Sequence, residues 1–171
     1  IGVSNGDDTV DIGSLTAGYT SLAIHGDGAT DVVNVNKSLT LASGRNLTVS
    51  DVGTVSLPNT SSDITASGSG AISIEVLESI SLESGASITT ADGNLTLSAN
   101  QQTTPASGEF IGIEIASATV SSTGAGNISV AGRGGTWGFG GVWLHSGTIQ
   151  GGSGSVTVVG DGGADGGGNS E

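Results

Sequence analysis

Residues 131–145 hold the densest group of side chains in the chain that are able to bind a ligand. Both tryptophans and one of the two phenylalanines lie within seven residues there. Flat rings stack on the apolar faces of sugars, and neighbouring polar groups fix the orientation of the ligand. One hypothesis is a glycan-binding platform, and its members are Arg133, Trp137, Phe139, Trp143 and His145. The favoured interpretation is that these aromatic rings fold back and cover the structure beneath them.

Two glycine-rich turns carry carboxylates at the same spacing, one at residues 26–31 and one at residues 160–165. Carboxylate and carbonyl oxygens are the ligands that Ca²⁺ prefers. One hypothesis is weak Ca²⁺ binding by Asp27, Asp31, Asp161 and Asp165, with Ca²⁺ as the candidate cofactor. The favoured interpretation is a pair of solvated acidic turns, because the aspartate comes one position later than in the nonapeptide β-roll repeat and the copies are not in tandem.

No arrangement of residues predicts a catalytic centre. His25 and His145 are the only histidines, and neither has a serine or cysteine at the spacing of a nucleophile motif. Glutamates such as Glu83 and Glu114 offer pairs that an acidic chain produces by chance. The three basic residues fall on different repeats, whereas a polyuronate lyase needs a basic residue beside clustered carboxylates. The sequence therefore favours a non-enzymatic protein.

Short apolar-polar-apolar triplets recur along the chain and indicate strands with one buried face. They occupy residues 10–12, 22–24, 33–35, 39–41, 47–49, 55–57, 72–74, 80–82, 95–97, 113–115, 128–130, 142–144 and 156–158. Single aliphatic residues, namely Ile64, Ile88, Val120 and Ile149, lie between some of the triplets. The order of triplet, single aliphatic and triplet repeats every 25 to 33 residues or so, which is typical of a solenoid.

This period predicts a right-handed parallel β-helix of about six coils, each with three short strands of three to five residues. We expect residues 1–171 to form a single β-helix segment of a longer repetitive protein, with an irregular or capping first coil at about residues 1–35. Outward positions should form two ladders. One contains Thr48, Ser73, Thr96, Ser129 and Thr157, and the other contains Thr40, Ser56, Ser81, Glu114 and Trp143.

Asparagines at equivalent corners support the same repeat. Asn46, Asn94 and Asn127 each precede a strand and also satisfy the glycosylation sequon, as do Asn36 and Asn59. Asparagine tolerates the left-handed conformation and pairs its amide with nearby backbone. We interpret these residues as structural corners. The corner after residues 74, 97, 130 and 158 varies in length, and insertions of this kind gather on one face of a solenoid.

Composition and charge exclude several functions. The chain has no cysteine, 3 Lys and Arg against 16 Asp and Glu, and a formal net charge of −13. Disulfide frameworks and cysteine-ligated metals are excluded. Nucleic acid and anionic membrane surfaces would be repelled, so we expect neither as a partner, and the apolar runs are too short for membrane insertion in this segment. Neutral glycans and cations suit the charge better.

The segments Gly-Asn-Leu-Thr-Leu-Ser-Ala at 93–99, Gly-Asn-Ile-Ser-Val-Ala-Gly at 126–132 and Gly-Ser-Val-Thr-Val-Val-Gly at 154–160 resemble coils of large bacterial surface proteins. These are β-helical proteins of the filamentous-haemagglutinin and autotransporter-adhesin type. The resemblance implies an extracellular or cell-surface location in a Gram-negative bacterium and a structural or adhesive role. The partners would be a cell-surface glycan or polysaccharide, neighbouring cells, and flanking coils of the same chain. The alternative is a carbohydrate-active β-helix, a polysaccharide lyase or hydrolase, with catalytic coils partly outside this segment.

Overall fold

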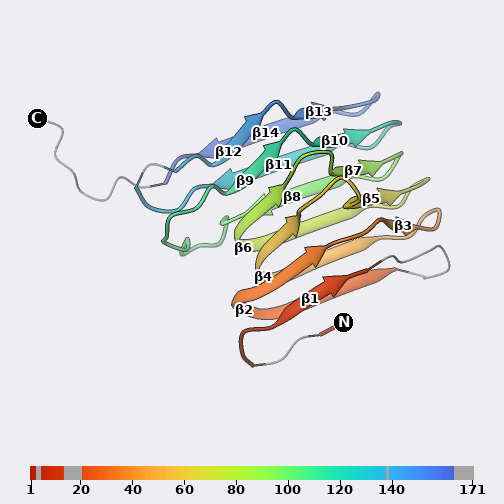
Figure 1. Ribbon diagram of the computed structural model, residues 1–171. Helices are drawn as coiled ribbons and strands as arrows, with labels where there is room; N and C mark the ends of the chain where they lie inside the picture. Colours follow the sequence, from red (N-terminus) through yellow and green to blue (C-terminus); the bar gives the residue numbers. More distant parts are fainter. Residues whose placement is uncertain (3–4, 14–20, 138, 164–171) are drawn as a thin grey trace, which may run out of the picture.

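The computed structural model describes residues 1–2, 5–13, 21–137 and 139–163. These residues form a parallel β-solenoid of about six turns, stacked one above another (Figure 1), with no helix among them. No helix in this part of the chain is long and apolar enough to cross a membrane. The predicted all-β parallel solenoid is therefore confirmed.

In the described part of the chain, fourteen strands build two parallel sheets. The larger sheet contains β1 (Thr9–Ile12), β2 (Leu22–Val35), β4 (Leu47–Leu57), β6 (Ile72–Leu82), β8 (Leu95–Ala99), β9 (Ile113–Ala116), β11 (Ile128–Arg133), β12 (Val142–His145) and β14 (Val156–Asp161). The smaller sheet contains β3 (Leu39–Leu41), β5 (Asp63–Ala66), β7 (Ser87–Thr90), β10 (Thr119–Ser122) and β13 (Thr148–Gln150).

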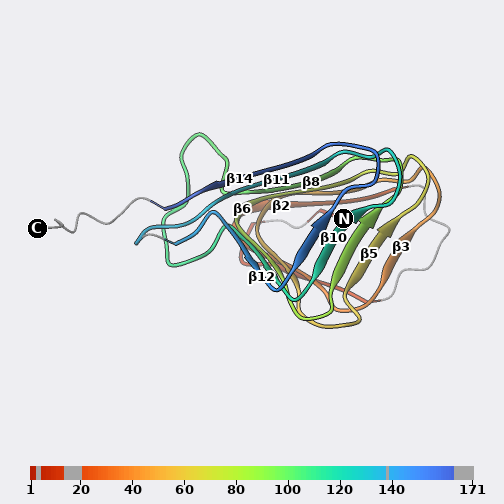
Figure 2. The same cartoon turned by 90° about the horizontal axis from the view of Figure 1, so that it is seen from above.

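Each turn has three faces, and the cross-section is three-sided when the stack is seen from above (Figure 2). The first face consists of the beginnings of β2, β4 and β6, followed by β8, β11 and β14. The second face consists of β1, the ends of β2, β4 and β6, then β9 and β12. The smaller sheet is the third face.

Strands β2, β4 and β6 are longer than the three to five residues predicted, with 14, 11 and 11 residues. The corner between the first and second faces is short in these turns, so the parallel pairing runs through it with shifts in register. Beyond β6 the same corner is interrupted by loops, and the two faces become separate strands.

The core is a set of aliphatic rows that run along the stack. On the third face, Leu39, Ile64, Ile88, Val120 and Ile149 are in register. These include the four single aliphatics of the sequence pattern, and three of them, Ile64, Ile88 and Val120, are fully buried. On the first face the row contains Leu22, Leu47, Ile72, Leu95, Ile128 and Val156. The apolar residues of the triplets are therefore buried in the inner turns, as the period of two predicts, whereas Leu144, Val156 and Val158 of the last turn are exposed.

Outward residues form ladders, with one correction to the prediction. Thr48, Ser73, Thr96, Ser129 and Thr157 are in register on the first face, as expected. On the second face the row contains Ser56, Ser81, Glu114 and Trp143. Thr40 is not in this row, because its strand pairs with β5 and places Thr40 beside Thr65 on the third face.

The asparagine corners hold neighbouring turns together. The Asn46 side-chain oxygen accepts the backbone N–H of Ala71 at 2.9 Å, and that of Asn94 accepts the N–H of Asn127 at 3.1 Å. The Asn127 oxygen accepts both the backbone N–H and the hydroxyl of Ser155, each at 2.9 Å. These contacts confirm the structural role predicted for the three corner asparagines.

Asn127→Ala is expected to lower the free energy of unfolding by about 1–2 kcal/mol, because the hydrogen bonds to Ser155 are lost at a solvent-exposed corner. Ser129→Ala, an exposed outward position two residues away, serves as the control and should change stability by less than about 0.5 kcal/mol. Chemical denaturation monitored by circular dichroism measures both values. Equal effects of the two substitutions would contradict the asparagine ladder.

Candidate ligand-binding groove

Two loops extend the corner between the first and second faces. Residues 100–112 connect β8 to β9, and residues 134–141 connect β11 to β12. They project from the side of the stack, at the left of Figure 2. The sequence predicted that insertions would gather at this corner, and the structure places both loops there. Hollows lie on each side of them, one over the second face and one over the first.

The hollow over the second face has aromatic walls and an acidic floor. One part, of about 300 Å³, is lined by Ser79, Ile80, Ser81, Glu109, Phe110, Ile111, Glu114 and Phe139. An adjoining part is lined by Ile111, Phe139, Gly140, Val142 and Trp143. The two parts share Ile111 and Phe139 and therefore form one continuous surface, which we call the aromatic groove.

Strand register produces the floor of this groove. Ser81, Glu114 and Trp143 occupy equivalent outward positions on β6, β9 and β12, so they follow one another along the stack. The Trp143 indole stacks on the His145 imidazole, with ring centroids 5.3 Å apart and an angle of 9° between the planes. The two rings can stack because residues two apart on a strand point to the same side. His145 therefore supports one face of the Trp143 ring.

Asn100 fixes the loops that form the walls. It is fully buried and has a left-handed backbone, with φ of 58°. Its side-chain oxygen accepts the backbone N–H of Ala106 at 2.7 Å, and its amide nitrogen donates to the carbonyls of Ala106 at 3.2 Å and Gly134 at 3.4 Å. The side chain thereby connects the first loop to the second. A buried polar side chain with several partners rigidifies its surroundings.

Backbone hydrogen bonds pair the loops further. The N–H of Gly135 donates to the carbonyl of Phe110 at 2.9 Å, and the N–H of Thr136 donates to the carbonyl of Gly108 at 2.7 Å. The loop that carries Phe110 and the loop that carries Phe139 are therefore held against one another. Asn100, Glu109 and Phe110 could not be predicted as site residues, because no local pattern indicates which loops will pair.

The structure brings together only part of the predicted glycan platform. Phe139 and Trp143 line the aromatic groove, and His145 stacks on Trp143. Trp137 does not line it and is 67 % exposed, so the favoured interpretation of aromatics folding back does not hold for this residue. Arg133 pairs with Asp161 at 3.5 Å and lines a different hollow beside residues 105–107.

Comparisons with protein-family models, with curated proteins and with solved structures find no similar protein. The fold is established as a parallel β-solenoid, and its function has to be inferred from the chemistry of its surface.

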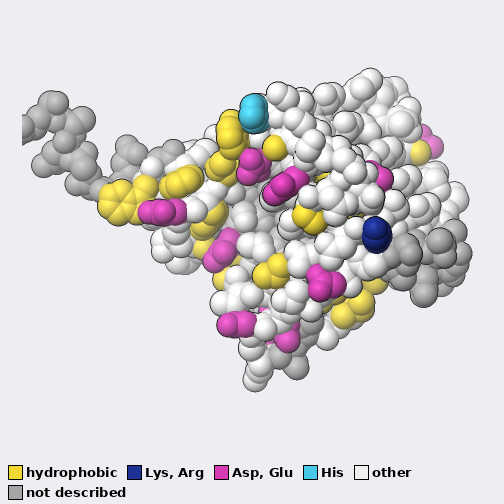
Figure 3. Space-filling view, viewed as in Figure 1, with side chains coloured by type: hydrophobic (Ala, Val, Ile, Leu, Met, Phe, Trp, Pro, Cys, Tyr) yellow, Lys and Arg dark blue, Asp and Glu magenta, His cyan; other side chains and the backbone are white. Residues whose placement is uncertain are grey.

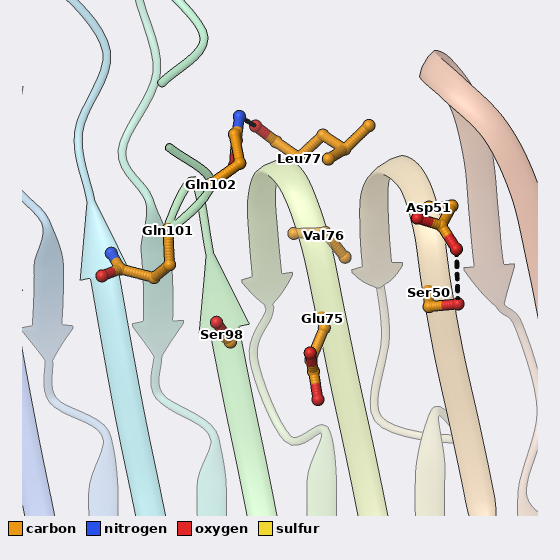
Figure 4. A pocket seen from close by; sticks show the side chains of 8 residues that line it. All are labelled: Ser50, Asp51, Glu75, Val76, Leu77, Ser98, Gln101 and Gln102. Carbon is orange, nitrogen blue, oxygen red and sulfur yellow. Dashed lines mark hydrogen bonds between the residues drawn. The ribbon is translucent and has the colours of Figure 1, made fainter. Parts of the chain in front are cut away.

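The hollow over the first face has a volume of about 250 Å³ and is lined mostly by polar residue types (Figure 4). It is lined by Ser50, Asp51, Glu75, Val76, Leu77, Ser98, Gln101 and Gln102. Several of these side chains already have protein partners. The Ser50 hydroxyl donates to the Asp51 carboxylate at 2.9 Å, and the Gln102 amide donates to the Leu77 carbonyl at 2.8 Å.

Strand pairing also gives His25 a serine neighbour that the sequence spacing did not reveal. The His25 Nδ1 atom lies 2.8 Å from the Ser50 hydroxyl oxygen, because the two residues are in register on β2 and β4. The Ser50 hydroxyl also donates to the Asp51 carboxylate at 2.9 Å, and while it does so its proton is not shared with the His25 ring. This arrangement differs from a nucleophile activated by a base.

The predicted calcium ligands do not form one cluster. Asp27 and Asp31 lie on β2, whereas Asp161 lies on β14 at the other end of the sheet, and Asp165 is outside the described residues. Asp161 pairs with Arg133. Within the part of the chain that the structure describes, no group of three or more His, Cys, Asp or Glu side chains is arranged to hold a metal. Calcium binding stays a hypothesis.

Asp31 has a structural role instead. Its side chain is 1 % exposed and accepts the backbone N–H groups of Asp27 at 2.8 Å and Asp8 at 3.1 Å. The hydrogen bond from Asp27 is the main cause that lowers the pKa of the Asp31 carboxyl below its ordinary value of 3.8, against the opposing effect of burial. Through these two hydrogen bonds, the carboxylate connects the glycine-rich corner of β2 to the segment before β1.

This lowered pKa predicts a dependence of stability on pH. Asp31 stabilises the fold fully above its ordinary pKa, and that stabilisation is lost as the pH falls below 3.8 toward the folded pKa. Asp31→Asn should therefore destabilise the protein at neutral pH and flatten the loss of stability in acid. Urea denaturation across the acidic range measures this, with the exposed neighbour changed in Asp27→Asn as control. An unchanged acid profile in Asp31→Asn would contradict the assignment.

Proposed function

We propose that this solenoid is a non-enzymatic structural and adhesive module of a large exported bacterial surface protein, and that it binds a polysaccharide in the aromatic groove. The observation that carries this proposal is the groove itself, where Phe110, Phe139 and Trp143 lie beside the carboxylates of Glu109 and Glu114. Sugar-binding surfaces combine flat rings with hydrogen-bonding side chains in this way.

Trp143 is the main stacking surface in this proposal. It is 45 % exposed, and the His145 ring behind it limits its rotation. A sugar ring placed on the free side of the indole would bring its hydroxyl groups toward Glu114 and Ser81, which follow Trp143 in the same row. Carboxylates accept hydrogen bonds from sugar hydroxyls, and serines both donate and accept them.

The solenoid supplies rigidity for such binding. The floor residues lie on paired strands, and the wall loops are fixed by Asn100 and by the backbone bonds between them. A groove formed before the ligand arrives loses little conformational entropy on binding. A rod with such grooves on its side can act as a spacer and as an adhesive surface at the same time.

The surface location is part of the proposal and is supported by the repeat pattern. Corner asparagines, hydroxyl ladders and the absence of cysteine are compatible with coils of the filamentous-haemagglutinin and autotransporter-adhesin type. The net charge of −13 favours solubility. The proposed partners are accordingly a polysaccharide or the glycans of neighbouring cells, together with flanking coils of the same chain.

Polysaccharide hydrolysis is a second candidate, and one observation favours it. Glu109 and Glu114 line the same groove, as the two carboxylic acids of a glycosidase would. A lyase is favoured less, because no lysine or arginine is among the residues that line the two parts of the groove.

Isothermal titration with a panel of soluble polysaccharides tests the proposal, with tryptophan fluorescence and an assay for new reducing ends in the same samples. The proposal predicts saturable binding of at least one polysaccharide without product formation. New reducing ends would replace it with the hydrolase. No binding of any polysaccharide would overturn the adhesive part and leave a passive spacer.

A further inference from the structure

We infer that the aromatic groove selects a cationic amino-polysaccharide, a chain of hexosamine units with free amino groups. This inference names the ligand of the proposed function and therefore rests on it. It is carried by the charges around the groove, by the register of Glu114 beside Trp143, and by the distribution of the basic residues of the chain.

The groove is lined by carboxylates, and the basic side chain beside it is the imidazole of His145, which stacks on Trp143. Glu109 and Glu114 both line its larger part, and neither part is lined by lysine or arginine. In the space-filling view, acidic (magenta) and hydrophobic (yellow) side chains lie beside one another over this side of the molecule, and dark blue is confined to a small area toward the right (Figure 3). An anionic glycan would meet two like charges there, which is unfavourable.

The three lysine and arginine residues of the chain are elsewhere. Arg133 pairs with Asp161 beside another hollow, Lys37 lies between β2 and β3, and Arg45 lies between β3 and β4. None of them neutralises the carboxylates of the groove. The net charge of −13 also attracts a polycation from a distance.

The register of the strands sets the distance between the Trp143 ring and the Glu114 carboxylate. Glu114 on β9 is the direct neighbour of Trp143 on β12, and paired strands are about 4.8 Å apart. A hexosamine stacked on Trp143 therefore has its ring substituents within reach of the Glu114 carboxylate. An ammonium group would form a charge-assisted hydrogen bond there, which is roughly twice as strong as a neutral one. An N-acetyl group would form only a neutral hydrogen bond.

Oligosaccharides of matched length test this selectivity. Glucosamine, N-acetylglucosamine and galacturonate oligomers are titrated calorimetrically at low salt and mildly acidic pH. The glucosamine oligomer should bind about tenfold more tightly than the acetylated one, and the galacturonate oligomer should bind least. Added salt should reduce the advantage of the glucosamine oligomer.

Two variants test whether the preference for glucosamine comes from the groove or from the net charge of the protein. Glu114→Gln should remove the preference for glucosamine while the acetylated oligomer still binds. Glu83→Gln removes the same charge at an exposed position outside the groove and should keep the preference. Both variants change an exposed or half-buried side chain, and circular dichroism shows whether each retains the fold.

The outcomes distinguish the inference from the proposed function. Equal or tighter binding of the acetylated oligomer overturns the selectivity and leaves polysaccharide binding in place. Equal effects of Glu114→Gln and Glu83→Gln assign the preference to net charge and overturn the site. If no oligomer or polysaccharide binds, the proposed function itself fails.

Discussion

Leu95→Asp is expected to abolish the cooperative unfolding of the solenoid. Leu95 is fully buried on β8, in the row between Ile72 and Ile128 of the adjacent turns. An aspartate there places a charge among aliphatic side chains without a partner, and such a substitution destabilises by more than about 4 kcal/mol. The turns on both sides lose a packing neighbour at once. Thermal and urea denaturation followed by circular dichroism should show a broad or absent transition.

Thr96→Asp is the matched control for this substitution. Thr96 is the next residue on the same strand, and its side chain points outward between Ser73 and Ser129. The same aspartate at this position remains in contact with water, so the change in unfolding free energy should stay below about 1 kcal/mol. Similar damage from both substitutions would contradict the assignment of inward and outward positions.

Trp143→Ala is expected to remove most of the affinity for a polysaccharide. The substitution deletes the ring supported by His145 and leaves the groove without its main stacking surface. Loss of a central aromatic contact costs about 2 kcal/mol or more, which is a decrease in affinity of roughly 30-fold. Calorimetry with the polysaccharide that binds the unchanged protein measures this directly, because it does not depend on the tryptophan as a reporter.

Trp137→Ala provides the control with the same change in side chain. Trp137 is more exposed than Trp143, at 67 % against 45 %, but it does not line the groove. Its loss should change the affinity by less than about threefold, which is the size of a peripheral contact. A larger loss in Trp137→Ala than in Trp143→Ala would place the binding surface at the loop tip and overturn the aromatic groove.

The sequence determined the fold because its signals are local. Alternation of apolar and polar residues fixes which side chains point inward, and a strand shifted by one residue would expose every aliphatic side chain. The row of Ile64, Ile88 and Val120 could therefore be predicted from spacing alone. The corner asparagines could be predicted for a similar reason, since Asn94 and Asn127 occupy the same position before equivalent strands.

The site was determined only in part by the sequence. Trp143 and Glu114 were assigned to one ladder, because the register of the repeat places them there. Phe110 and Glu109 were not found, since they lie in a loop whose path depends on Asn100 and on backbone bonds to the next loop. The pair of His25 and Ser50 was also missed, because their contact joins residues 25 positions apart.

The difference between the features that the sequence determined and those that only the tertiary structure decided has one physical reason. Burial of an aliphatic face requires a fixed period along the chain, so the amino-acid sequence by itself determined the number of turns, the core rows and the corner where loops extend. A loop outside the repeat has no period, and its position is decided by hydrogen bonds to residues far along the chain. Only the tertiary structure therefore decided that Phe110, Phe139 and Trp143 share one groove and that Arg133 lies outside it.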